Sequence, residues 1–168
     1  MTIPFRVEAL GRGHARAGFS CGVEALDRYL AQQAAQDVRR RVSACYVAVD
    51  LASERIAGYY TLAAASVPLS GLSEDLARLV PRYPMVPVAR LGRLAVDLGY
   101  RGRKLGAALL ADAALRGLRS EVGMFALVVD AKDDIAAGFY RHHGFQPLGG
   151  NARQLIVALK HFGLRAGR

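Results

Sequence analysis

One segment, residues 88–119, constrains the fold of this chain more than any other. It opens with a mostly apolar run, which predicts a buried strand, and it closes with leucines and alanines at helical spacing. Between these lies a turn at residues 101–107 that holds two glycines and three cations. Backbone N–H groups at a helix N-terminus lack partners, and the helix dipole favours negative charge there. The segment therefore predicts a strand, an anion-binding turn suited to a pyrophosphate, and a helix.

The turn alone does not identify the ligand. It is not a P-loop, because no Gly-Lys-Ser/Thr ends it, and it lacks the full Gly-x-Gly-x-x-Gly pattern of a dinucleotide site. A glycine-containing basic turn before a helix is more often a plain connection. The neighbouring segments decide the interpretation.

The remaining segments predict one α/β domain over residues 1–168. An edge strand is predicted over residues 3–10, and a hairpin over residues 43–50 and 55–67. Further strands are predicted over residues 124–130 and 155–159. A helix is predicted over residues 21–39, with Ser20 as its cap, and a shorter helix over residues 133–143. Gly144 suits the left-handed position after that shorter helix.

The order of these motifs resembles a known family. A strand, an Arg-Gly-x-x-x-Gly-Ala turn, a helix, a strand and then Phe139-Tyr140-x-x-x-Gly144-Phe145 resemble the acetyl-CoA-binding core of GNAT N-acetyltransferases. The segments Leu-Gly-Arg-Leu-Ala-Val-Asp (91–97), Phe-Ser-Cys-Gly (19–22) and Tyr-Tyr-Thr (59–61) are similar to the GNAT toxins of bacterial toxin–antitoxin pairs. The resemblance spans roughly residues 5 to 159, and it implies a single GNAT-like α/β domain with a mixed, mostly antiparallel sheet and flanking helices.

The resemblance also implies the site. Acetyl-CoA is the cosubstrate, its pantetheine lies along the strand before the turn, and Tyr140 protonates the leaving sulfur. A tyrosine hydroxyl with an ordinary pKa near 10 is a proton donor at neutral pH. The implied cofactor-binding residues are Leu94, Ala95, Val96, Arg101, Gly102, Arg103, Lys104, Leu105, Gly106, Ala107 and Asp133.

Two of these residues depart from the family pattern. Lys104 stands where the family usually has glycine, and lysine is strained there if the backbone needs a positive φ. Asp133 stands where many GNAT enzymes have an asparagine that touches the cofactor, and a carboxylate would repel the phosphates of CoA.

The sequence offers no clear general base, because Asp97 equally suits a cap of the turn, and His142 and His143 equally suit a solvated surface. An α-amine with a pKa near 8 is already partly neutral at pH 7, which favours an α-amine acceptor over a lysine side chain. The toxins that the chain resembles acetylate aminoacyl-tRNA, block translation and are held inactive by a ribbon-helix-helix antitoxin. A GNAT enzyme acting on a small amine or a protein N-terminus, and a non-catalytic RNA- or CoA-binding module, remain alternatives.

The net charge of +9 agrees with an RNA partner. Cations outside the turn that could contact tRNA are Arg39, Arg40, Arg41, Arg90 and Arg93, although the first three also suit the C-terminal dipole of a helix. We expect no metal, since no Cys/His cluster has zinc spacing, and no membrane span. Two cysteines and no signal peptide predict a cytoplasmic protein, and a homodimer is left open.

Overall fold

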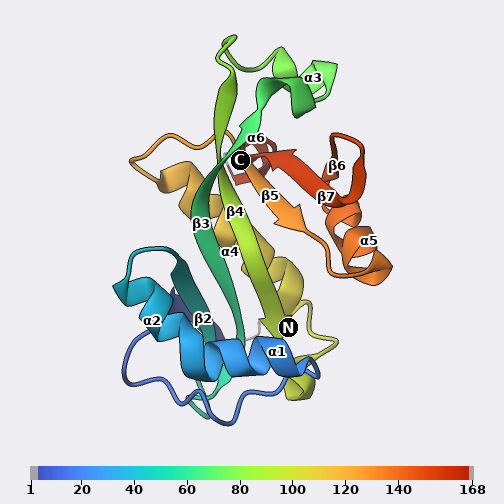
Figure 1. Cartoon of the computed structure of the whole chain (residues 1–168). Helices are drawn as coiled ribbons and strands as arrows, with labels where there is room; N and C mark the ends of the chain where they lie inside the picture. The colour runs from blue at the N-terminus through green and yellow to red at the C-terminus, as the bar shows by residue number, and fades with distance from the viewer. Residues whose placement is uncertain (1–3, 167–168) are drawn as a thin grey trace. The chain divides into compact units, whose positions relative to one another are not determined.

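The computed structural model describes residues 4–166, with side chains through Gly163. The described residues form a seven-stranded sheet with the strand order β1-β2-β3-β4-β5-β7-β6 (Figure 1). The strands are β1 (Phe5–Ala9), β2 (Ala44–Asp50), β3 (Ile56–Pro68), β4 (Met85–Val96), β5 (Ala126–Asp130), β6 (Gln146–Leu148) and β7 (Asn151–Ala158).

The sheet is mixed and mostly antiparallel, as the sequence predicted. Strand β2 pairs antiparallel with β1 and β3, and β7 pairs antiparallel with β5 and β6. Strands β4 and β5 pair in parallel, with Val88 opposite Ala126. A parallel pair needs a long crossover, and the helix that follows the predicted anion-binding turn supplies it.

The helices connect or flank these strands. They are α1 (Glu24–Arg28), the π-helix η1 (Tyr29–Gln33), α2 (Ala34–Arg39), the 3₁₀ turns η2 (Leu69–Gly71) and η3 (Leu98–Tyr100), α3 (Glu74–Ala77), α4 (Leu105–Arg119), α5 (Asp134–His142) and α6 (Leu159–Ala166). None of the helices in the described part of the chain has the length and apolar character needed to cross a bilayer.

The chain divides into two compact units, each with its own core. Unit 1 comprises residues 4–63 and 92–113, and its core includes Leu30, Val47 and Tyr59, all fully buried. Unit 2 comprises residues 64–91 and 114–166, and Val128 and Ile156 lie in its core. Strands β3 and β4 each contribute residues to both units.

The first long helix differs from the prediction at its start and in its middle. It begins at Glu24 rather than at residue 21, and its N-cap is Val23, which makes no side-chain cap. Ser20 does not cap it, because the Ser20 N–H donates to Asp97 Oδ2 (3.0 Å) and so joins Ser20 to the end of β4. The π segment η1 interrupts the α-helical pattern in the middle.

Most of the other predicted elements are confirmed. The 43–50 and 55–67 hairpin is present as β2 and β3, the edge strand as β1, and the shorter helix as α5. Gly144 has φ +96°, the left-handed conformation expected of it. Residue 3 of the predicted edge strand lies outside the described residues. Strand β6 and helix α6 were not predicted.

Candidate active site

The predicted strand, turn and helix are all present, and from Gly92 to Ala113 they belong to unit 1. Strand β4 ends at Val96, η3 and a loop follow, and α4 begins at Leu105. Gly102 has φ +78°, and a side chain at this position would meet no atom within 4 Å. The backbone at Gly102 is therefore open to close approach by a bulky ligand.

Asp97 fixes the end of β4. It is 4% exposed, and its carboxylate accepts hydrogen bonds from the N–H groups of Gly99 (2.9 Å) and Ser20 (3.0 Å). The Leu98 N–H donates in return to the Ser20 carbonyl (2.9 Å). Of the two roles that the sequence left open, the structure gives Asp97 the capping role, because both oxygens already accept from the backbone.

Gly58 brings β3 close to β4 and α4 in the same unit. A Cβ at Gly58 would lie 2.9 Å from the Ala95 carbonyl oxygen and 2.9 Å from Leu109 Cδ1. Only a residue without a side chain fits this approach. The glycine therefore helps to seat the first turns of α4 next to the strand segment predicted to bind pantetheine.

The cations of the turn are exposed, and two of them are oriented by protein contacts. Arg101 donates through Nη2 to the Cys21 carbonyl (2.8 Å), and the guanidinium of Arg103 lies 5.4 Å from the ring centroid of Tyr100. Lys104 is also exposed. Together with the unpaired N–H groups of the first turn of α4, these charges make the turn electropositive and suited to a pyrophosphate.

Lys104 has the left-handed backbone that the family's usual glycine would adopt without strain. The φ of Lys104 is +61°. Its carbonyl accepts the first hydrogen bond of α4, from the Ala108 N–H (3.2 Å). A side chain in this conformation costs about 1–2 kcal/mol. The strain expected of a lysine with a positive φ is thus present at Lys104.

Tyr140 lies in unit 2, on α5. Its side chain is 8% exposed, with ring centroids 5.3 Å from Phe139 and 5.2 Å from Phe145. Burial alone raises the pKa of Tyr140 to about 12. The hydroxyl therefore remains protonated throughout the neutral range, as a proton donor requires.

Asp133 caps α5. Its side chain accepts a hydrogen bond from the Ala136 N–H (2.8 Å), a usual N-cap contact. This contact explains an aspartate here without a ligand. A direct role in cofactor binding stays a prediction.

The two histidines beside Tyr140 differ in exposure. His142 is exposed, and His143 is half-buried with its ring centroid 4.8 Å from Phe139. Within residues 4–166, no group of three or more His, Cys, Asp or Glu side chains is arranged to hold a metal ion.

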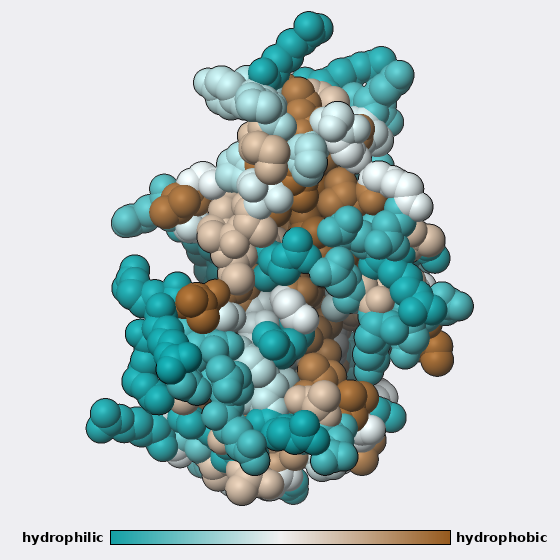
Figure 2. Space-filling view, viewed as in Figure 1, coloured by the Kyte–Doolittle hydropathy of each residue, from teal (hydrophilic) through white to brown (hydrophobic). Residues whose placement is uncertain are grey.

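The cations proposed for RNA have different surroundings. Arg39, Arg40 and Arg41 are exposed at the C-terminal end of α2, where Figure 2 shows hydrophilic side chains over the surface. Arg90, in unit 2, forms an ion pair with Asp130 (2.5 Å). Arg93, in unit 1, places its guanidinium carbon 3.5 Å from the ring centroid of Tyr29.

Sequence reasoning missed a group of aromatic and polar residues in unit 1. Tyr29 donates through its hydroxyl to Asp37 Oδ2 (2.8 Å), and its ring stacks near that of Tyr59 with centroids 6.4 Å apart. Fully buried Tyr60 donates to Asp112 of α4 (2.5 Å). Apart from the Tyr-Tyr pair at residues 59–60, no local motif announces these contacts, since they join residues 8 to 52 positions apart.

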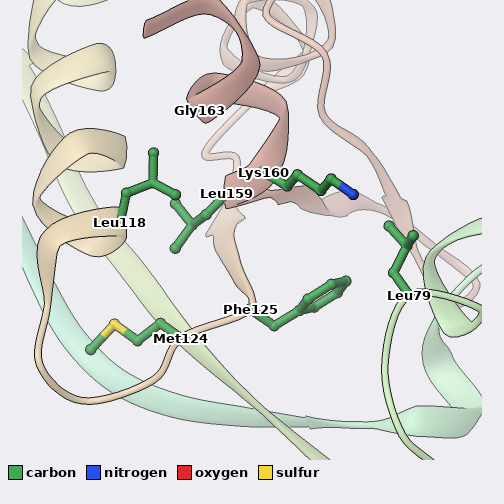
Figure 3. A pocket seen from close by; sticks show the side chains of 7 residues that line it. All are labelled: Leu79, Leu118, Met124, Phe125, Leu159, Lys160 and Gly163. Carbon is green, nitrogen blue, oxygen red and sulfur yellow. The ribbon is translucent and has the colours of Figure 1, made fainter. Parts of the chain in front are cut away.

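A separate apolar pocket of about 430 Å³ lies in unit 2 (Figure 3). Leu118, Met124, Phe125 and Leu159 form much of its wall, and Lys160 is the one charged residue among the lining residues that the structure describes. Among the described residues, the lining holds no acid, tyrosine or histidine. This lining does not suit acid–base chemistry, and the roles of the turn and of Tyr140 in acetyl transfer stay predictions.

A family comparison settles which kind of protein has this arrangement. The family described as "Acetyltransferase (GNAT) domain" matches residues 41–147, which include β4, the turn, α4 and Tyr140. This chain belongs to the GNAT acetyltransferase family. It is accordingly an acyltransferase that uses acetyl-CoA, as the motif order predicted.

Within this family, the chain is similar to toxins that act on tRNA. The chain is 35% identical over 144 residues to a tRNA-acetylating toxin of Mycobacterium tuberculosis, with 84% of each chain covered. It is 29% identical, with a TM-score of 0.87, to AtaT complexed with acetyl-methionyl-tRNAfMet, covering 96% of this chain and 99% of that one. It is also similar to a tyrosine-to-phenylalanine mutant of AtaT bound to acetyl-CoA and the C-terminus of the antitoxin AtaR, with 27% identity, a TM-score of 0.79, and 98% and 99% of the chains covered.

Proposed function

We propose that this GNAT acetyltransferase transfers the acetyl group of acetyl-CoA to the α-amine of aminoacyl-tRNA and thereby blocks translation as a toxin. The observation that carries the proposal is similarity over nearly the whole chain to a tRNA-acetylating toxin and to AtaT in complex with an acetylated aminoacyl-tRNA. The net charge of +9 supports a polyanionic substrate.

The residues of the turn fit the cosubstrate. Gly102 leaves open space for it, and three exposed cations at residues 101, 103 and 104 flank the N-terminus of α4, which suits the pyrophosphate of CoA. We assign the backbone of Leu94, Ala95 and Val96 to pantetheine, because the pairing of β4 with β5 ends before them at Leu91. Leu105, Gly106 and Ala107 form the first turn of α4. A contact of Asp133 with the cofactor remains a prediction, since its carboxylate caps α5.

Acetyl-CoA supplies an acyl group activated as a thioester. The neutral α-amine forms the new C–N bond at the acetyl carbon, and the C–S bond breaks. The protonated hydroxyl of Tyr140 donates to the departing sulfur, and the proton that the nitrogen releases to solvent balances the one that sulfur gains. No side-chain base is required, because an α-amine beside an ester is substantially neutral near pH 7.

The cations outside the turn are proposed to contact tRNA. Arg39, Arg40 and Arg41 are exposed and ready to meet phosphates. Arg90 has to exchange its ion pair with Asp130 for a phosphate, whereas Arg93 carries no such ion pair among the described residues.

A ribbon-helix-helix antitoxin is the proposed regulator, and the AtaT structure that contains the C-terminus of an antitoxin supports an antitoxin partner. The cytoplasm is the proposed compartment, because charged tRNA is found there. A homodimer and a single 1–168 domain remain predictions.

The test is direct. The protein is incubated with acetyl-CoA and charged total tRNA, and the aminoacyl-nucleosides released by nuclease are examined by mass spectrometry. N-acetylated aminoacyl-adenosine is expected, and expression of the chain alone should arrest growth. Acetyl groups on small amines or protein N-termini, with none on aminoacyl-tRNA, would favour the alternative substrates and refute the toxin proposal.

A further inference from the structure

Arg93 of β4 is stacked on a tyrosine. Its guanidinium carbon lies 3.5 Å from the ring centroid of Tyr29, which is the first residue of the π segment η1. Contact at this distance is a close cation–π interaction. Stacking uses the face of the guanidinium and leaves its N–H donors, which lie in the guanidinium plane, available.

The tyrosine is itself held in place from two sides. Its hydroxyl donates to Asp37 Oδ2 (2.8 Å), and the other oxygen of Asp37 accepts from Gln33 Nε2 (2.9 Å). Its ring lies nearly parallel to that of Tyr59, at 14°, and Tyr59 is anchored through a hydroxyl bond to the Leu26 carbonyl (2.6 Å). Tyr29 therefore forms a rigid platform under Arg93.

The charge of Arg93 has no matching carboxylate. Among residues 4–166, Arg6, Arg28 and Arg90 each form an ion pair within 4.0 Å, but Arg93 forms none. Hydrogen bonds from Gln33 and Tyr29 occupy the oxygens of Asp37 and are the main reason that its pKa is lowered, while the charge of Arg93 lowers this pKa to a smaller extent. A positioned guanidinium whose charge no ion pair neutralises suits a bidentate contact to phosphate.

The place of Arg93 along β4 indicates which phosphate. It directly precedes Leu94, where the proposed pantetheine segment starts, while the pyrophosphate turn follows the other end of that segment. The reactive end of the cosubstrate thus points along β4 toward Arg93. On the basis of the proposed function, we infer that Arg93, held on Tyr29, binds a phosphodiester of the single-stranded 3′ end of aminoacyl-tRNA and positions the α-amine for attack.

The inference is tested by comparing two acceptors, aminoacyl-tRNA and 3′-O-aminoacyl-adenosine, which has the same amine but no phosphodiester. Arg93→Gln should lower kcat/KM for aminoacyl-tRNA by about 10- to 100-fold, mainly through KM, as expected for loss of a charged hydrogen bond. It should leave kcat/KM for aminoacyl-adenosine and KM for acetyl-CoA unchanged. The slope of log affinity against log salt should fall by about 0.7, the value for one single-strand phosphate.

Three further variants separate binding from folding. Arg28→Gln removes the same charge from an exposed ion pair on α1 and should leave both acceptors unaffected. Tyr29→Leu removes the platform and should reproduce part of the Arg93→Gln defect on aminoacyl-tRNA. Tyr29→Phe keeps the ring and should restore most of the activity.

Three results would overturn the inference while leaving the proposed function intact. One is equal loss with both acceptors, which would mean a structural role, and another is an unchanged salt slope in Arg93→Gln. The third, a rise confined to KM for acetyl-CoA, would assign Arg93 to the cosubstrate instead. Wild-type protein that acetylates no aminoacyl-tRNA would refute the proposed function itself, before any variant is compared.

Discussion

Lys104 permits a paired test of strain and binding at the cofactor turn. Its φ of +61° costs a residue with a side chain about 1–2 kcal/mol, and glycine escapes this cost. Lys104→Gly and Lys104→Ala remove the same charge, but only the glycine variant also removes the strain. We expect the glycine variant to be more stable than the alanine variant by about 1 kcal/mol, or about 2–4 °C in Tm for a chain of this length.

The same pair measures the contribution of the ammonium group to cosubstrate binding. Both variants should bind acetyl-CoA more weakly by a similar amount, about 1 kcal/mol or fivefold in Kd, because an exposed cation is screened by solvent. Thermal unfolding without ligand gives the first quantity, and calorimetric titration gives the second. Equal stability of the two variants would refute the strain argument, and unchanged Kd in both would remove Lys104 from the phosphate site.

Three further predictions concern single residues. Tyr140→Phe should lower kcat by about 10²- to 10⁴-fold in steady-state assays while acetyl-CoA affinity holds, since the ring contacts to Phe139 and Phe145 remain; an unaltered kcat would exclude it as the acid. Gly58→Ala should destabilise the chain by about 1–3 kcal/mol in denaturant unfolding, because its Cβ would lie 2.9 Å from a backbone carbonyl, and a neutral result would mean that β3 is free to shift. Hydrogen bonds from Tyr100 and the Ala52 N–H lower the pKa of Asp50, so the ionised carboxylate stabilises the fold above pH about 4, and this stabilisation is lost as the pH falls below that value. Asp50→Asn should flatten this acidic part of the curve of unfolding free energy against pH. Identical curves for the variant and the wild type would contradict a stabilising role of the Asp50 carboxylate.

Local patterns were enough to predict the strand and the helix of the proposed cofactor site. The apolar run of β4, the glycines of the turn and the helical spacing of α4 all lie within residues 88–119, so short-range rules apply to them. Ser20 shows where such rules fail. Its local sequence suits an N-cap, but its N–H is bonded to Asp97, 77 residues away in sequence, and the helix starts later.

The Arg93 platform could not be read from the sequence for the same reason. A single arginine in a strand and a single tyrosine in a helix carry no local sign that they will meet, and the pairing of Arg93 with Arg90 in one cluster concealed their different partners. Helix α6 was missed because its residues directly continue the apolar run of β7.

The π segment η1 bears on how this chain tolerates insertion and deletion. A π turn holds more residues than an α turn, so a helix that contains one is often the equivalent of a regular helix with one residue inserted. Removing one residue from Tyr29–Gln33 would restore regular α-helical bonding, but it would disturb a segment that carries the buried side chains of Tyr29 and Leu30. Regular hydrogen bonding and core packing are therefore opposed in this helix, and the π segment keeps Tyr29 within reach of Asp37.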